Sequence, residues 1–130
     1  MPRSAADVLA AARARLTRVT AAEARARQEA GALLVDVRTD AQRVAAGEIP
    51  GARVIALNHL EWRLDPQSPS RIAEAADHDL EVIVLCAEGY SSSLAAARLH
   101  ELGLHRATDV VDGFAGWQAA DLPVIPPAAP

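Results

Sequence analysis

The stretch EVIVLCAEGYSSSL, residues 81–94, predicts a strand, a short loop and the start of a helix in direct succession. The apolar run 82–85 has the length and the β-branched content of a buried strand. It ends at Cys86, the one cysteine of the chain. Gly89 and three serines follow, and the alanine-rich segment 94–99 is then expected to be helical.

A strand, a glycine-containing loop and a helix N-terminus bring several backbone N–H groups around one point. Such a cradle, here residues 86–92, concentrates positive potential where the thiol lies, which favours thiolate and the binding of an anion beside it. The alternative is a structural cysteine, because a lone Cys at the end of an apolar strand is usually a small core residue. Core packing requires neither the glycine nor the serines, so we interpret Cys86 as a reactive thiol.

The segments around this stretch alternate between strand and helix patterns. Strands are expected at 33–38, 53–57 and 108–111, and helices at 4–16, 20–30, 39–46, 58–64, 71–76 and 114–119. Ser4 and Thr20 are the expected N-caps of the first two helices, with Glu23 completing a capping box at Thr20. This alternation predicts an α/β fold with a mainly parallel sheet and helices on both faces.

Ligands in such folds collect at the carboxyl ends of the strands, where Asp36, Arg38 and Cys86 are expected. Asp36 is either catalytic or the partner in a structural ion pair, and the ion pair is the favoured interpretation. Arg38 either faces the site or only neutralises a carboxylate. Trp62 and Arg63 either form a wall of the substrate cleft or pack at the edge of the core.

Composition limits the possible functions. A chain of 130 residues, 51% of them hydrophobic, is long enough for one domain with a core. Its net charge of −4 disfavours nucleic acid as a partner. One cysteine allows no internal disulfide, which fits a reducing cytoplasm, and no apolar run has membrane-spanning length. The four histidines lack metal-ligand spacing, so we predict no metal site. Because no apolar run is long enough to span a membrane, we also predict no membrane partner.

The chain also resembles a known family, the rhodanese-like sulfurtransferases of the single-domain type. The resemblance extends from about residue 19 to residue 124, and it rests on four elements in the family's order. These are Asp36-Val37-Arg38, the turn at 47–52 (GEIPGA), the loop Cys86-Ala87-Glu88-Gly89-Tyr90-Ser91 with the following Ser92, and the closing segment 112–124 (DGFAGWQAADLPV).

The resemblance implies a rhodanese-like fold over residues 1–130, with a helical extension at 1–17 and a proline-rich tail at 125–130. It implies an enzyme of the thiosulfate sulfurtransferase type, in which Cys86 cycles between thiolate and persulfide without a cofactor. A small donor such as thiosulfate would load the sulfur, and cyanide, a small thiol or a protein thiol would accept it. The loop residues 87–92, with Arg38, Trp62 and Arg63, would bind the substrate, and Asp36 would support the site.

Two features of the loop depart from the family pattern. Ser91 stands where the family often has Arg, and Glu88 adds a negative charge. Two other function classes stay open. Phosphatases of the cell-cycle type share the fold, but they need an Arg six positions after the Cys, where this chain has Ser92. A non-catalytic or regulatory binding module is the second alternative.

Overall fold

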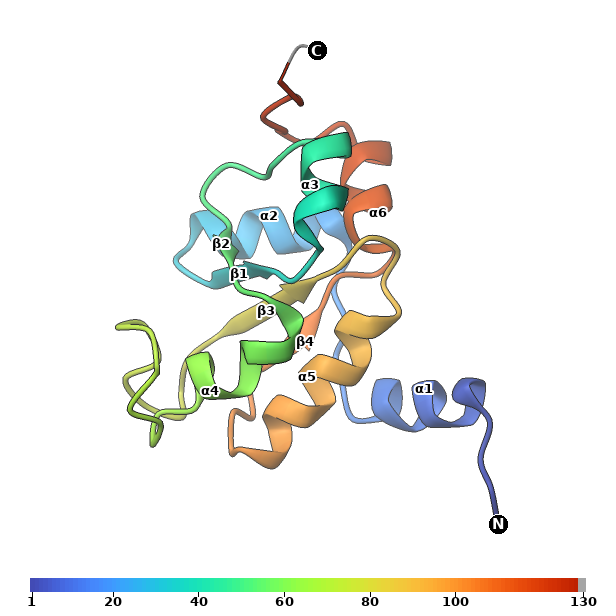
Figure 1. Cartoon of the computed structure of the whole chain (residues 1–130), viewed down its shortest axis with the longest axis vertical. Coiled ribbons are helices and arrows are strands. Elements are labelled where there is room, and N and C mark those ends of the chain that lie inside the picture. The colour runs from blue at the N-terminus through green and yellow to red at the C-terminus, as the bar shows by residue number, and fades with distance from the viewer. Residues whose placement is uncertain (129–130) are drawn as a thin grey trace.

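The computed structural model describes residues 1–128, and a parallel four-stranded sheet lies at its centre (Figure 1). The strands are β1 (Leu33–Asp36), β2 (Arg53–Val54), β3 (Val82–Leu85) and β4 (Thr108–Asp109), in the spatial order β2-β1-β3-β4. β1 and β3 pair along their whole length, with Asp36 opposite Leu85. The predicted α/β fold with a mainly parallel sheet is therefore confirmed, and the carboxyl ends of all four strands point to one edge.

β3 is the most deeply buried strand, because both of its faces contact helices. Val82 and Val84 belong to one hydrophobic cluster and Ile83 and Leu85 to the other, all with no exposed surface. A continuous β-branched run suits such a position, and each side chain of this size contributes roughly 1.5–3 kcal/mol by leaving water. Cys86 follows directly after this strand, so the chain leaves the core at the thiol.

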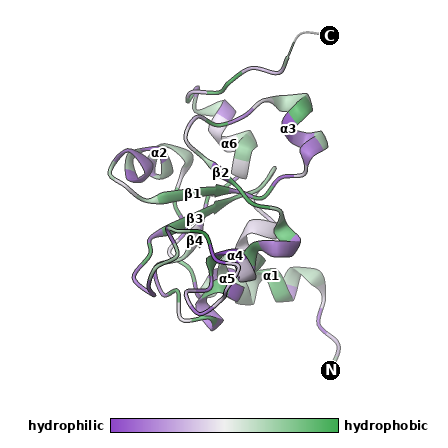
Figure 2. Cartoon of the chain, turned by 60° about the vertical axis from the view of Figure 1, so that its left-hand side comes forward, coloured by the Kyte–Doolittle hydropathy of each residue, from purple (hydrophilic) through white to green (hydrophobic). Residues whose placement is uncertain are grey.

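Helices cover both faces of the sheet, as predicted (Figure 2). One face carries α1 (Ala5–Ala14), α4 (Leu60–Leu64) and α5 (Ser91–Glu101), and the other carries α2 (Ala21–Glu29), α3 (Asp40–Ala46) and α6 (Gly113–Ala119). A 3₁₀ turn, η1 (Leu57–His59), leads into α4. The predicted N-caps Ser4 and Thr20 are present, and each forms a capping box with the residue three positions on.

Two predictions about the segment between β2 and β3 are wrong. Residues 71–76 form turns rather than a helix, because the Ile72 amide bonds across to the Arg63 carbonyl at 2.8 Å and a segment this short does not nucleate a helix on its own. The helix predicted at 58–64 also begins later than expected, because Asn58 lies inside η1 and α4 begins at Leu60.

Two segments outside the four strands are also attached to the sheet region. Val19 forms a parallel bridge with Val110 just beyond β4, and Ile125 forms an antiparallel bridge with Glu48. Residues 129–130, the end of the predicted proline-rich tail, lie outside the described residues. Within residues 1–128, no helix combines the length and the apolar character needed to cross a membrane.

Candidate active site

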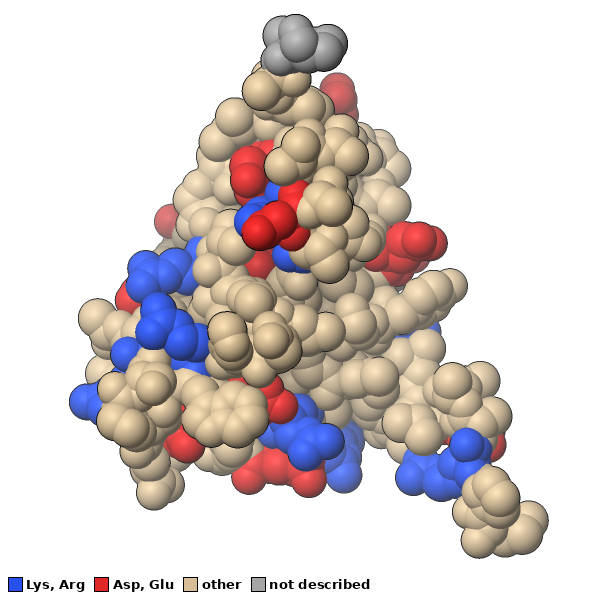
Figure 3. All heavy atoms as spheres, in the orientation of Figure 1, with Lys and Arg blue, Asp and Glu red and all other residues tan. Residues whose placement is uncertain are grey.

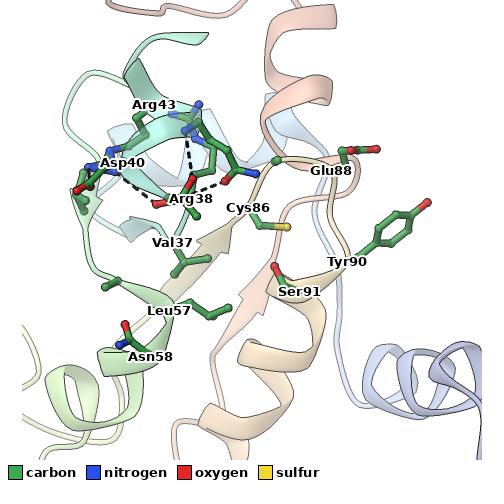
Figure 4. Close-up of a pocket in the computed structure, with 15 residues that line it drawn as sticks. Val37, Arg38, Asp40, Arg43, Leu57, Asn58, Cys86, Glu88, Tyr90 and Ser91 are labelled. Carbon is green, nitrogen blue, oxygen red and sulfur yellow. Dashed lines mark hydrogen bonds and ion pairs between the residues drawn. The ribbon is translucent and has the colours of Figure 1, made fainter. Parts of the chain in front are cut away.

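Cys86 lies at the carboxyl end of β3 (Figure 4), and hydrogen-bond donors surround its sulfur. The Gly89 amide donates to Sγ at 3.1 Å and the Ser92 amide at 3.4 Å, while the Ser92 hydroxyl oxygen lies 3.2 Å from it. The Ser91 side chain also points toward the sulfur. The cradle predicted from the sequence is therefore present, with the N-terminus of α5 as its floor.

The pKa of Cys86 reflects two opposing influences. Burial of the side chain raises the pKa, since a thiolate loses hydration there, but hydrogen bonds from Ser92 and Ser91 and from the Gly89 amide lower it by more. The resulting pKa is below the ordinary value of a cysteine thiol. A thiolate is the nucleophilic form of cysteine, so this environment activates the side chain.

The loop that carries these donors is fixed from behind by α6. The Phe114 amide donates to the Cys86 carbonyl at 2.8 Å, and the Ala115 amide donates to the Ala87 carbonyl at 3.0 Å. Gly89 adopts a φ of +90°, and a Cβ there would approach the Asp112 nitrogen to 2.9 Å. The turn at Gly89 therefore requires glycine.

Cys86 opens onto a pocket of about 780 Å³ between the loop, α3 and η1. Its wall opposite the loop is partly apolar and includes Val37, Val54 and Leu57. Only 6% of Cys86 is exposed, so its sulfur lies at the inner end of this pocket. In Figure 3 charged atoms gather over α3, while the middle of this face is largely uncharged.

Arg38 lines the pocket, but its charge is already matched. Its guanidinium donates to both Asp36 carboxylate oxygens, at 2.8–3.1 Å, and to the Gly47 carbonyl at 2.8 Å. It also stacks on the Phe114 ring at 3.8 Å. Asp36 and Arg38 are both almost fully buried, so this pair ties the end of β1 to the end of α3. Asp36 thus has the structural ion pair that the sequence favoured.

Trp62 and Arg63 do not lie where a cleft wall would require. The wall facing Cys86 comes from β2 and η1 instead, and within the described part of the chain the pocket lining contains neither residue. Trp62 is 61% exposed, and Arg63 donates to the Ser70 carbonyl at 2.8 Å. The reason is the helix geometry of α4, which faces its core with Leu60 and Leu64 and leaves the positions between them outward.

The six predicted loop residues fall into two groups. Gly89 and Ser92 are buried behind the sulfur, whereas Ala87, Glu88, Tyr90 and Ser91 line the pocket. Glu88 and Tyr90 are exposed, and their side chains point away from Cys86 in Figure 4. The negative charge of Glu88 therefore lies at the rim rather than beside the thiol.

The sequence did not indicate a second layer of polar residues behind the loop. Asp109 in β4 is fully buried and accepts hydrogen bonds from the hydroxyls of Ser92 and Ser93, both at 2.8 Å. Arg13 and Arg18 reach the same region from the N-terminal segment. The one sequence signal that could have located this layer is Asp109 itself, a charged residue inside a short apolar strand, because a buried carboxylate needs partners.

The structure offers no evident place for a metal ion in its described part, because residues 1–128 contain no group of three His, Cys, Asp or Glu side chains arranged to share one.

Comparison with known proteins gives consistent matches. The family model for the rhodanese-like domain matches residues 20–120. A thiosulfate sulfurtransferase GlpE of Actinobacillus succinogenes is 38% identical over 97 residues, which cover 75% of this chain and 78% of that protein. The protein of the same name from Haemophilus influenzae is 35% identical over 106 residues, covering 82% and 91%.

A solved structure of similar size is a Rhodopseudomonas palustris protein of unknown function, described as a possible tyrosine phosphatase. It superposes with a TM-score of 0.85 at 29% identity, and the match covers 95% of this chain and 96% of that one. The two chains therefore share the fold over nearly their whole lengths.

Proposed function

This chain belongs to the rhodanese-like domain family, and on that premise we propose that it is a sulfurtransferase that carries sulfane sulfur on Cys86. The observation that carries the proposal is the convergence of two backbone amides and the Ser92 hydroxyl on the sulfur of a buried thiol that opens onto a pocket. A packing cysteine needs none of these donors.

The reaction proceeds by two displacements at sulfur. The Cys86 thiolate attacks the sulfane sulfur of a donor such as thiosulfate, the donor's S–S bond breaks, and its electron pair leaves with sulfite. Cys86 then carries a persulfide. An acceptor thiolate attacks the outer sulfur, and Cys86 leaves as a thiolate again. With cyanide as acceptor the product is thiocyanate, and no cofactor takes part in either step.

The same donors serve both half-reactions. In each of them negative charge passes through the Cys86 sulfur, so amides held in place by α5 and α6 stabilise that charge without rearrangement. Small thiols, cyanide and exposed protein thiols are the acceptors we propose. A thiolate nucleophile must stay reduced, which favours the cytoplasm as its location.

The pocket supports a donor with an anionic head and an acceptor that extends beyond it. Its volume of about 780 Å³ exceeds what a single thiosulfate ion fills. The head would lie against the loop near Ser91, and the apolar wall at Val54 and Leu57 would contact the body of an acceptor thiol.

A phosphatase is the second candidate, because the Rhodopseudomonas palustris protein is described as a possible one. A phosphate dianion is recognised best by a bidentate guanidinium. Six positions after Cys86 the chain has Ser92, which carries no guanidinium, and Arg38 is paired with Asp36. We therefore propose sulfur transfer rather than phosphate transfer.

Mass spectrometry of the purified protein after incubation with thiosulfate tests this function. We expect a gain of one sulfur atom on Cys86 that is lost on adding cyanide, and no gain in Cys86→Ser, whose hydroxyl is far less nucleophilic. A folded wild-type protein that gains no sulfur from thiosulfate or from a persulfide donor would contradict the proposal and favour a binding module. Release of phosphate from an aryl phosphate would favour the phosphatase.

A further inference from the structure

We propose that the N-terminal segment is a working part of the active site, in which Arg13 and Arg18 are positioning residues that hold the Cys86 loop through the Gly89 carbonyl and Asp109. The family model begins at residue 20, so both arginines precede the matched region. From its sequence, this segment is expected to be no more than a helical extension. The inference rests on the proposed function, because it concerns the thiol that would carry the sulfur.

The segment that carries the two arginines is docked on β4. Val19 donates to the Asp109 carbonyl at 3.1 Å and accepts from the Val111 amide at 2.8 Å. The Thr108 hydroxyl donates to the Thr17 carbonyl at 2.8 Å. These bonds fix Arg18 beside β4, and α1 lies alongside α5 just before it (Figure 1). The two side chains are therefore aimed at the loop by main-chain contacts.

Both guanidinium groups meet at one loop carbonyl. Arg13 Nη2 donates to the Gly89 carbonyl at 2.8 Å and Arg18 Nη2 at 3.1 Å. The amide of the same glycine donates to the Cys86 sulfur at 3.1 Å. Gly89 is thus held from behind by two cations while its N–H points at the thiol. A Cβ at Gly89 would lie 3.3 Å from Arg18 Nη2, so the close approach depends on the glycine.

The second connection runs through Asp109. Arg18 donates to both of its carboxylate oxygens, at 2.8 and 3.1 Å, and Arg18 is 17% exposed while Asp109 is fully buried. Ser92 and Ser93 donate to the same carboxylate, and Arg13 Nε donates to the Ser93 hydroxyl at 3.2 Å. The two arginines and Asp109 therefore form one partly buried network directly under the hydroxyl that contacts the sulfur.

The Ser92 hydroxyl has one proton and two neighbours that can accept it. With a neutral thiol, the Cys86 S–H donates to Ser92 Oγ and the Ser92 proton goes to Asp109. When Cys86 ionises, the thiolate becomes the stronger hydrogen-bond acceptor, and the Ser92 hydroxyl donates to the sulfur. Asp109 then keeps Ser93 and Arg18 as donors. Arg18 thus allows the Ser92 hydroxyl to donate to the thiolate while the buried Asp109 carboxylate keeps a charged partner.

The charges of Arg18 and Asp109 should have a measurable effect on the ionisation of Cys86. A buried carboxylate close to a thiolate disfavours ionisation of the thiol, and a guanidinium on that carboxylate cancels the effect. The other charged groups around Cys86 are paired elsewhere or exposed: Arg38 pairs with Asp36, Arg43 pairs with Asp40 and Glu48, and Glu88 is exposed. Loss of Arg18 should therefore leave Asp109 as the dominant unbalanced charge near the sulfur.

The test measures the pH midpoint of Cys86 alkylation, together with thermal unfolding, in matched Arg-to-Met variants. Arg18→Met should raise the midpoint by about one pH unit, and Arg13→Met should raise it less, because Arg13 does not touch Asp109 directly. Arg15→Met is the control. It removes the same charge from the same segment, but its side chain is exposed and lines a different pocket with Arg27 and Arg106.

The double variant Arg18→Met/Asp109→Asn separates positioning from mere structural support. Removing the carboxylate should return the midpoint close to that of the wild type, whereas a loop that had only lost its support would not recover. Should Arg18→Met fail to fold, Arg13→Met decides. Midpoints in the folded single variants Arg18→Met and Arg13→Met that equal the midpoint of the Arg15→Met control would overturn the proposal. Alkylation requires no sulfur transfer, so this result is independent of whether thiosulfate is a substrate.

Discussion

Cys86 is a residue at which burial and hydrogen bonding act in opposite directions on the same proton. Burial raises the pKa, and the donors from Ser92, Ser91 and Gly89 lower it to below the ordinary value. The thiolate is present above this lowered pKa and is lost as the pH falls through it. A free cysteine thiol has a pKa of about 8.5. We therefore expect the rate of alkylation by iodoacetamide to reach half its maximum at a pH below that value. A midpoint at or above it would mean that the donors do not act on the sulfur.

Ser92 should account for the largest part of that effect, since both its hydroxyl and its amide reach the sulfur. Ser92→Ala removes only the hydroxyl, and we expect the alkylation midpoint to rise by about one pH unit, because a hydrogen bond to a charged group contributes about 1.5–3 kcal/mol. Ser91→Ala is the matched control, and its rise should be smaller. Equal midpoints for the two variants would show that the buried position of Ser92 confers nothing special.

At the scale of secondary structure, the loop depends on how closely α6 approaches it. Gly113 begins α6 with a φ of +54°, and a Cβ there would collide with the Cys86 carbonyl and approach the Glu88 and Gly89 amides to 2.9 Å. Because Gly113 has no side chain, α6 comes close enough for the amides of Phe114 and Ala115 to donate to the loop carbonyls of Cys86 and Ala87. The glycine is therefore required by the joint between two elements rather than by either one alone.

Gly113→Ala should destabilise the fold and weaken sulfur transfer together. We expect a loss of about 2–4 kcal/mol in the free energy of unfolding, from backbone strain and from the collision. Gly31→Ala is the control, because φ is +112° there but a Cβ would have nothing within 4 Å. It should cost about 1–2 kcal/mol and leave the Cys86 persulfide yield unchanged. Chemical denaturation of both variants checks the comparison. Similar losses would show that α6 can move aside.

Local patterns predicted the elements whose own residues determine them. The capping boxes at Ser4 and Thr20 and the apolar run of β3 needed no tertiary information. Residues 71–76 resembled a helix in composition, but Ile72 and Ala75 are buried and the Ile72 amide is bonded to the Arg63 carbonyl. Tertiary packing decided that segment, and nothing in its own sequence indicated the partner.

At the scale of the whole molecule, the sequence predicted the part of the site that is continuous along the chain. The cradle at residues 86–92 follows from one strand, one glycine and one helix start. Asp109 and Arg18 are 91 positions apart, and they meet because Val19 docks beyond β4. Trp62 and Arg63 are the opposite case, since they follow a pocket element in the sequence but are not among the residues that line the pocket. Register and docking of distant segments decide such contacts.

The balance of charge around the pocket also emerges only from the assembled molecule. Arg38 is paired with Asp36, and Arg43 is paired with Asp40 and Glu48, so the cations that line the pocket are neutralised. Among the Arg38 nitrogens only the buried Nη1 has no hydrogen-bond partner within the described residues, so an anionic donor depends mainly on the loop amides and the serine hydroxyls. Glu88 adds an exposed negative charge at the rim. Thiosulfate should bind without a free guanidinium.

A cation placed at position 91 should change this most, because the Ser91 side chain lines the pocket and points toward the sulfur (Figure 4). We expect Ser91→Arg to raise kcat/KM for thiosulfate about ten-fold through a charge-assisted contact, and we expect the gain to shrink at high salt. Ser91→Met, which has bulk without charge, should give no gain. Glu88→Gln should give less than about a two-fold gain, since the carboxylate is exposed and solvated. If Ser91→Arg and Ser91→Met act alike in steady-state assays over a range of salt concentrations, the pocket does not select its donor by charge.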